Sequence, residues 1–219
     1  MNSTLKLARE LFRNGFDPTS IVTYLELRRA LKGCDSVLDV GCGPASAVRH
    51  FGFKHLTGLE FFLPDLEKAL YNRTHHEFIH GDVRNLDRLL PGKQVDASVA
   101  LDVIEHLKKE EGHKFIKDLE RISTKRIALL TPNGFLPQGN AERGDLQAHY
   151  SGWSADEMKS LGFDVTGILG PKRMRGEYHR LKWKPKFLWG IVSLVAHFVW
   201  TRWRPSSAAA ILCVKTLKG

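Results

Sequence analysis

Apolar and polar positions follow two alternating patterns along the chain. Apolar runs of strand length occur at 36–40, 55–60, 77–80, 96–102, 126–131, 163–169 and 208–217. The run at 96–102, DASVALD, is apolar on both faces, which is typical of a parallel strand covered by helices on each side. Stretches of helical periodicity separate most of these runs. The pattern therefore predicts an α/β fold with a doubly wound, mostly parallel sheet.

The predicted helices have recognisable starts and ends. They cover 3–14, the stretch from Pro18 to Gly33, 63 to about 73, 108–122 and the stretch from Ser154 to Gly162. Asp17 and Pro18 suit an N-cap and a first turn, and Ser154 with Glu157 forms a capping box. We expect one helix before the first strand to start at Pro18 and to end at Gly33.

The stretch VLDVGCGPAS at 37–46 is the centre of the predicted site. A buried strand runs directly into Gly41-Cys42-Gly43, and glycines in such a turn let the backbone approach a ligand. Residues 44–50 then resemble a helix start, whose N–H groups and partial positive charge would face the turn. The G-x-G-x-x-G fingerprint of dinucleotide sites is incomplete, because Ser46 stands at the third glycine position.

Acidic residues occur where the predicted strands end. Asp39 lies just before the glycine turn, Glu60 closes HLTGLE, Asp82 follows in HGDV, and ALDVIEHL covers 100–107. A carboxylate at Asp39 favours a cationic ligand over a pyrophosphate, and Glu60 could accept bonds from two ribose hydroxyls. Because ligands of such sheets bind beyond the carboxyl ends of the strands, we expect these acids to share one site.

Together these motifs resemble the class I S-adenosylmethionine-dependent methyltransferases, in particular the small-molecule, ubiquinone-type enzymes. The resemblance covers roughly 18–170 and the last strand. It implies a seven-stranded, Rossmann-like sheet whose final strand is antiparallel and lies between strands five and six. It also implies that the helix after Pro18 either closes over the cofactor or substrate or packs on the sheet.

The resemblance further implies S-adenosylmethionine as cofactor and a role for each motif residue. Asp39 would bind the ammonium group, Glu60 the ribose hydroxyls and Asp82 the adenine amino group. The remaining predicted cofactor contacts come from the glycine turn and two strand ends, namely Gly41, Cys42, Gly43, Val83 and Leu101.

An acceptor with a hydroxyl or an acidic carbon also needs a base, and histidine is the usual one near neutral pH. We predict His106, in DVIEHL, and His149, in AHYSGW, as catalytic residues. The alternative is structural, with His106 capping the next helix. We predict no metal site, because neighbours such as Glu105 and His106 point apart on a helix. The pair His75-His76 is expected to be solvated.

Composition indicates one domain over 1–219, with N-terminal helices at 1–33 and a basic and apolar helical insertion at 171–206. Three widely spaced cysteines form no disulfide or metal pattern, which favours a reducing cytoplasm. The N-terminal residues lack the apolar run of a signal peptide. The net charge is +9, and the insertion carries nine Lys and Arg residues against the single acid Glu177.

The insertion leaves three interpretations open. Between Lys186 and Arg202 lie 15 residues without formal charge, fewer than the roughly 20 that a membrane-spanning helix needs. As a helix it has one thin polar stripe (Lys186, Gly190, Ser193, His197 and Arg204), so we expect it to bury most of its circumference. It could dock on an anionic membrane surface through 172–204, form a lid or dimer helix, or bind RNA by base stacking.

We therefore predict a cytoplasmic methyltransferase, peripheral on a membrane, that acts on a small apolar or amphipathic acceptor. A quinone precursor, an isoprenoid or a lipid would fit this description. A continuous apolar run suits nucleic acid poorly, so we do not expect it as a partner, and the oligomeric state stays open. The alternatives are an RNA or protein methyltransferase drawn to the basic insertion, and a membrane-associated scaffold that has lost the chemistry.

Overall fold

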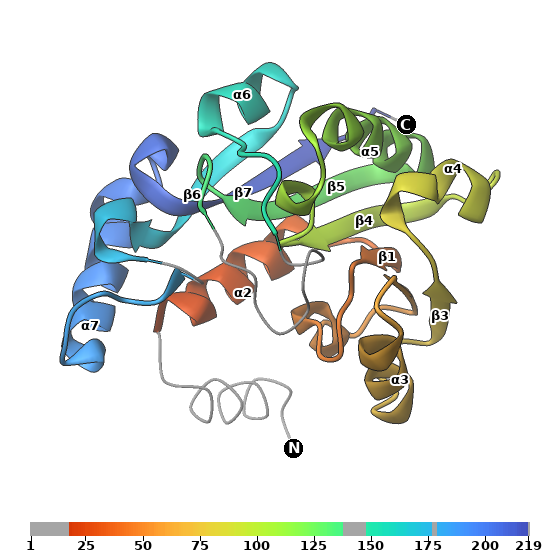
Figure 1. The fold of residues 1–219 in the computed structure, drawn as a ribbon, viewed down its shortest axis with the longest axis horizontal. Helices are drawn as coiled ribbons and strands as arrows, with labels where there is room; N and C mark the ends of the chain where they lie inside the picture. Colours follow the sequence, from red (N-terminus) through yellow and green to blue (C-terminus); the bar gives the residue numbers. More distant parts are fainter. Residues whose placement is uncertain (1–17, 138–147, 177–178, 219) are drawn as a thin grey trace.

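The computed structural model describes residues 18–137, 148–176 and 179–218. Its centre is a seven-stranded sheet in the order β3-β2-β1-β4-β5-β7-β6 (Figure 1). The strands are β1 (Ser36–Val40), β2 (His55–Glu60), β3 (Glu77–His80), β4 (Val95–Leu101), β5 (Ser123–Pro132), β6 (Asp164–Pro171) and β7 (Ala208–Thr216). Neighbouring strands from β3 to β5 pair in parallel, whereas β7 is antiparallel to β5 and β6. The predicted fold class and the antiparallel last strand are thus confirmed.

Helices cover both faces of this sheet. They are α2 (Pro18–Ala30), α3 (Leu63–Tyr71), α4 (Leu86–Leu89), α5 (Lys109–Ile122), α6 (Ala155–Ser160) and α7 (Lys186–Ala196). One apolar cluster joins Phe115 of α5 and Met158 of α6 to the sheet, and a second joins Leu27 and Leu31 of α2 to its other face. Alternate residues of one strand supply the two clusters, with Leu38 in the first and Val37 in the second, as the period of a strand requires. The helix predicted at 3–14 lies outside the described residues.

Helix α2 packs on the sheet, which is the second of the two arrangements that the resemblance implied for it. Leu27 and Leu31 are buried in an apolar cluster that also contains Val37 of β1 and Ala97 of β4. The Arg126 guanidinium of β5 donates to the carbonyl oxygens of Ala30 and Lys32 at 2.6 and 2.9 Å. Cations that bind the last carbonyls of a helix satisfy acceptors that have no partner within the helix. The carboxyl end of α2 is thereby fixed to the centre of the sheet.

The helix predicted after the glycine turn is only a single 3₁₀ turn. It covers Ala47–His50, and the Ser46 hydroxyl caps it by accepting from the Val48 N–H at 3.4 Å. Gly52 follows with a φ of 78°, a left-handed conformation that ends the turn and leads the chain to β2. The helix start predicted at 44–50 is thus a single turn that begins at Ala47 and ends at His50.

The insertion between β6 and β7 is helical, as predicted. It contains α7, which continues into a π-helical turn at His197–Thr201, and it lies beyond β6 at one end of the molecule (Figure 1). The prediction that the apolar residues of this helix are buried was wrong. Its small and polar residues Gly190, Ser193, His197 and Thr201 face the protein instead. Within the described residues, no helix has the length and apolar character needed to cross a membrane.

Candidate active site

The glycine turn is held between the ends of three strands. The Gly41 and Cys42 N–H groups donate to the Leu59 carbonyl of β2 at 2.7 and 3.1 Å. Gly41 has a φ of 69°, and a Cβ there would lie 2.6 Å from a methyl carbon of Val103, which follows β4. By contrast, nothing lies within 4 Å of the position that a Cβ would take on Gly43. The turn is therefore packed tightly on one side and open beside Gly43.

Glu60 connects this turn to the end of β2. Its carboxylate accepts from the Gly43 N–H at 2.9 Å and from the Phe62 N–H at 2.8 Å. Each oxygen uses one of its lone pairs in this way, so both can accept a further hydrogen bond. The position of Glu60 beside the open side of the turn is compatible with the predicted role in holding a ribose.

Asp39 lies below the turn with a partner that the sequence did not indicate. Its Oδ2 is 3.0 Å from His75 Nε2, and His75 Nδ1 is 2.8 Å from the Thr74 hydroxyl. Asp39 and His75 are both buried, so the expectation of a solvated His75 was wrong. His75 uses one acceptor position of Oδ2, so the Asp39 carboxylate keeps further acceptor positions for a ligand ammonium.

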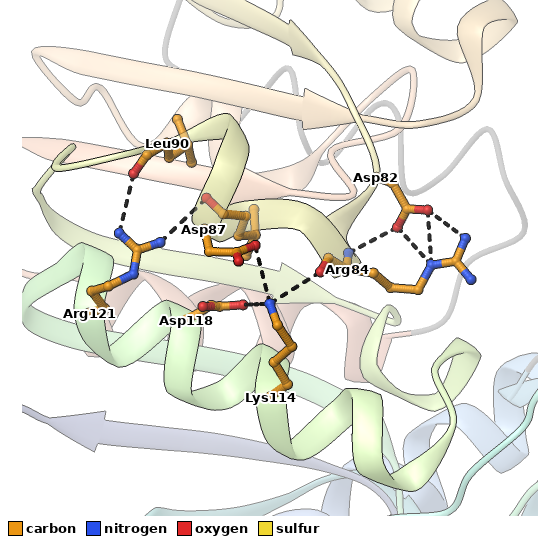
Figure 2. A network of polar contacts seen from close by, with 8 residues as sticks. Asp82, Arg84, Asp87, Leu90, Lys114, Asp118 and Arg121 are labelled. Carbon is orange, nitrogen blue, oxygen red and sulfur yellow. Dashed lines mark hydrogen bonds and ion pairs between the residues drawn. The ribbon is translucent and has the colours of Figure 1, made fainter.

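Asp82, after β3, forms an ion pair with Arg84 (Figure 2). It also caps the turn at Val83–Asn85 by accepting from the Arg84 N–H at 2.9 Å. Partial burial alone would raise the pKa of Asp82, but the hydrogen bonds and charge of Arg84 outweigh it and lower the pKa. An ionised carboxylate is an acceptor, as the predicted contact with an adenine amino group requires.

A second part of the polar network in Figure 2 fixes α4 to α5. Lys114 Nζ of α5 donates to Asp118 at 2.7 Å, to Asp87 of α4 at 3.2 Å and to the Arg84 carbonyl at 3.3 Å. The contacts hold the segment after β3, including Val83, against the core. Val83 packs on the apolar cluster, and Leu101 at the end of β4 is half-buried.

A tight turn after β4 contains three titratable side chains, those of Asp102, Glu105 and His106. Asp102 has a φ of 54°, and a 3₁₀ turn covers Ile104–His106. Glu105 is buried and accepts from the Thr131 hydroxyl of β5 at 3.0 Å. Burial, together with the charge of the exposed Asp102, raises the pKa of Glu105. The turn therefore contains one buried carboxyl group that holds its proton more tightly than usual.

The segment around residue 149 is fixed to this turn by backbone hydrogen bonds. The Tyr150 and Ser151 N–H groups both donate to the Glu105 carbonyl oxygen, at 2.9 and 3.1 Å. This contact brings His149 beside His106, and their ring centroids are 4.9 Å apart. The structure thus unites the two predicted catalytic histidines, which are 43 positions apart in the sequence, at the carboxyl edge of the sheet.

The hydrogen bonds of the two histidines define their protonation. His106 Nδ1 is 3.0 Å from the Ala148 carbonyl, and His149 Nδ1 is 2.7 Å from the Leu136 carbonyl. A carbonyl only accepts, so each Nδ1 carries a hydrogen and each neutral ring keeps its lone pair on Nε2. Burial is the main cause that lowers the pKa of both rings, which favours the neutral form at pH 7.

Glu105, His106 and His149 also form the set of donors within the described residues that could hold a metal. One ligand atom from each lies within 4.8 Å of the others. The prediction that Glu105 and His106 point apart was therefore wrong. It assumed a regular α-helix, whereas the residues occupy a 3₁₀ turn. Two imidazoles and a carboxylate suit a divalent transition metal, and a proton-accepting role suits the same nitrogens.

His179 is a nearby residue that the sequence analysis missed. It lies in the insertion with a φ of 55°, and the Arg175 guanidinium donates to its carbonyl at 2.6 Å. Burial, with smaller contributions from the charges of Arg175 and His149, lowers the pKa of His179 to about 4. No local pattern in the sequence connects this residue to the site, because only the folding of the insertion places it close to His149.

Comparisons with known proteins identify the class of this arrangement. Residues 38–134, from β1 to just after β5, match a family described as "Methyltransferase domain". No curated protein matches the sequence significantly.

Solved structures with the same fold are distant in sequence. The methyltransferase domain of bacterial CtHen1 has a TM-score of 0.58 and 17% identity, with 90% of this chain and 97% of that chain covered. A SAM-dependent methyltransferase from Archaeoglobus fulgidus has a TM-score of 0.55 and 16% identity, with 95% of this chain and 99% of that chain covered. Magnesium protoporphyrin IX methyltransferase from Synechocystis, with bound SAH, has a TM-score of 0.51 and 17% identity, with 91% of this chain and 81% of that chain covered.

Residues 38–134 thus match a methyltransferase domain, and the chain as a whole has the class I methyltransferase fold. The match supports S-adenosylmethionine-dependent methyltransferase activity, with S-adenosylmethionine as the cofactor. The glycine turn and Glu60 fit that cofactor, because the Glu60 carboxylate keeps acceptor positions beside the open side of Gly43. The roles of Asp39, Glu60, Asp82 and the two histidines stay predictions.

Proposed function

We propose that this methyltransferase acts on a small apolar or amphipathic acceptor, such as a quinone precursor, an isoprenoid or another lipid-like molecule, with histidine as the base. The observation that carries the proposal is the neutral pair His106 and His149, whose Nε2 atoms are free to accept a proton. His106 lies three residues after Val103, which packs beside Gly41 of the glycine turn, and His149 lies beside His106.

The base acts on the acceptor. When bound, S-adenosylmethionine supplies a methyl group on a sulfonium, and transfer of that group leaves S-adenosylhomocysteine. Nε2 of His106 or His149 would accept the proton of the acceptor hydroxyl and so prepare its oxygen to take up the methyl group. Glu60 would hold the cofactor in position. Correct alignment of the two reactants supplies much of the acceleration.

Exposed apolar side chains at the same edge of the sheet favour an apolar acceptor. Phe61 and Leu63 follow β2, Phe135 follows β5, and Tyr150 is adjacent to His149 in the chain. Large apolar side chains that stay exposed beside a polar site commonly mark a binding surface. These four residues would contact the acceptor or the cofactor ring.

Calorimetric titration with S-adenosylhomocysteine, with NAD as the control, tests cofactor binding. Transfer of labelled methyl groups to phenolic isoprenoids and to RNA then tests the acceptor class. We expect binding of S-adenosylhomocysteine alone and labelling of the isoprenoid alone. The variants His106→Gln and His149→Gln should bind the cofactor normally but lose roughly 100-fold or more in kcat. The exposed His55→Gln serves as the matched control.

A second candidate, methylation of RNA, is favoured by one observation. Lys182, Lys184, Lys186 and Arg204 in the insertion are exposed and could contact phosphates. Labelling of RNA in the same assay, without labelling of the isoprenoid, would replace the small-molecule proposal.

A further inference from the structure

We infer that the outer face of α7 and its π-helical continuation is a docking surface for an anionic lipid membrane. The surface consists of exposed apolar residues on one side of this helix, among them Phe187, Ile191, Val195, Phe198, Val199 and Trp203. The inference rests on the packing and charge of the insertion, and it deepens the proposed function by naming where an apolar acceptor would be met.

The helix is oriented opposite to a usual surface helix. A surface helix normally turns its apolar stripe toward the core and its polar side toward water. Here Gly190, Ser193, His197 and Thr201, at spacings of three or four residues, face the protein and are buried. Val199 on the opposite side is 77% exposed. The apolar residues thus form a continuous external face, which is costly in water and marks an interaction surface.

Close packing fixes this orientation. A Cβ on Gly170 of β6 would lie 2.0 Å from the Ser193 hydroxyl oxygen, and one on Gly167 would lie 2.1 Å from the Thr201 carbonyl oxygen. The Ser193 hydroxyl also donates to the Leu169 carbonyl at 3.1 Å. Only small residues on both elements allow such an approach, so the helix cannot rotate its apolar side inward without clashing with β6.

A buried arginine reinforces the same arrangement. The Arg175 guanidinium donates to the Thr19 hydroxyl of α2 at 2.8 Å and to the Ser193 hydroxyl at 3.3 Å, and it also binds the Leu169 carbonyl. At the other end of the helix, Arg202 forms an ion pair with Glu26 of α2. The helix is therefore fixed to α2 and β6 along its inner side, and its outer face is presented outward as one surface.

Charge identifies the occupant as an anionic surface. Lys182, Lys184 and Lys186 are exposed just before and at the start of the helix, and Arg204 is exposed just after it. A second copy of this chain packed on the same face would bring cations close to cations, whereas anionic headgroups would neutralise them. Each basic residue near such a membrane contributes roughly a five-fold gain in binding.

Tryptophan also favours a lipid interface over a protein partner. Trp183 and Trp189 lie at one end with ring centroids 4.7 Å apart, and Trp200 and Trp203 lie at the other end. Tryptophan is enriched at the boundary between headgroups and acyl chains. The 16 residues from Lys186 to Thr201 span about 24 Å at 1.5 Å per residue, enough for a helix that lies flat in that boundary.

The docking surface lies at the same edge of the sheet as the histidine pair. The insertion leaves the carboxyl end of β6 and returns at the start of β7, beside the end of β5. Lys172 donates to the Asn133 carbonyl at 2.6 Å, and the Asn133 amide donates to the carbonyls of Pro205, Ser206 and Ala208 at 2.9 Å. An acceptor that dissolves in the bilayer would therefore reach the site from the docked side.

Co-sedimentation of the full chain with vesicles tests the inference. Mixed phosphatidylcholine and phosphatidylglycerol vesicles are compared with pure phosphatidylcholine vesicles. We expect tight binding to the mixed vesicles and weak binding to the others. The double variant Val195→Glu with Val199→Glu should bind at least 100-fold more weakly, because it places charges in the apolar face. The triple Lys182→Gln, Lys184→Gln, Lys186→Gln variant should lose roughly 100-fold on mixed vesicles only.

A matched control separates this surface from exposed apolar residues in general. Leu70→Glu with Tyr71→Glu changes two exposed residues of α3 and should leave vesicle binding unchanged. Titration with S-adenosylhomocysteine shows whether each variant is folded, and it reports on the proposed function independently of the lipid. Absence of vesicle binding by the intact chain, or equal binding by the Val195 and Val199 variant, would overturn the inference. So would a dimer that the same variant dissociates, or retention on RNA instead of vesicles.

Discussion

Glu60 offers a direct test of the site, because it is the residue that connects the glycine turn to β2. Replacement by Ala removes a carboxylate that accepts two backbone hydrogen bonds, at 2.9 Å from Gly43 N and 2.8 Å from Phe62 N. Hydrogen bonds to a charged group contribute about 1.5–3 kcal/mol each, which sets the upper limit for each bond. Glu60 is half-buried, so water replaces part of what is lost.

We therefore expect Glu60→Ala to weaken the binding of S-adenosylhomocysteine by about 1–3 kcal/mol, a factor of roughly 5 to 150. Part of this loss comes from any direct contact with the ribose and part from a less ordered turn at Gly43. Glu60→Gln separates the two effects, because its amide oxygen can still accept one bond but its NH₂ group opposes the second N–H. Gln should therefore be intermediate between Glu and Ala.

Isothermal titration calorimetry measures both variants, and urea unfolding without ligand measures the free energy of unfolding. A matched control is Glu77→Ala, which changes an exposed carboxylate on the neighbouring strand β3. If Glu60→Ala binds S-adenosylhomocysteine as tightly as the unchanged protein, Glu60 is not part of the cofactor site. The reasoning from its two hydrogen bonds would then be refuted.

Three further results follow from the structure. Because burial lowers the pKa of His106 and His149, the catalytic base stays neutral down to lower pH, and the midpoint of the pH profile of kcat/KM should lie below pH 6.5; a midpoint above that pH would count against both as the base. Burial also lowers the pKa of His179 to about 4, so the folded state disfavours its protonation and the free energy of unfolding should fall from pH 6.5 toward pH 4. Urea unfolding should show this fall reduced in His179→Asn, and an identical slope in both proteins would count against it. Gly170→Ala should lower the free energy of unfolding by about 2–4 kcal/mol through its clash with Ser193 and its φ of 73°, whereas Gly52→Ala, with a φ of 78° and open space, should lose only about 1–2 kcal/mol; equal losses would show that the contact between α7 and β6 is loose.

The strands could be predicted from the sequence because their signals are local. The apolar runs predicted β1, β2 and β3 with the bounds that the structure has, since each is a short segment between turn residues. The glycine turn and the acids at the strand ends were found for a similar reason, because in a parallel sheet the carboxyl ends of strands necessarily meet at one edge. The predicted ends of β4, β5 and β6 differ from the observed ends by one to three residues, because the boundaries of helices and strands are the least sharply defined part of an element.

Contacts between segments far apart in the sequence determined the partners of the site residues and the orientation of α7. His75 is buried against Asp39, and His149 joins His106 and Glu105, because strand pairing and the Tyr150–Glu105 hydrogen bond bring together residues more than 30 positions apart. The sequence also showed that the helix after Lys186 has a polar stripe and an apolar remainder. It could not show which side faces the protein, because that depends on Gly167 and Gly170 of β6, where only small residues of the helix fit. Local pattern thus determined the elements and the place of the site, whereas tertiary packing determined the partners of the site residues and the face that α7 presents.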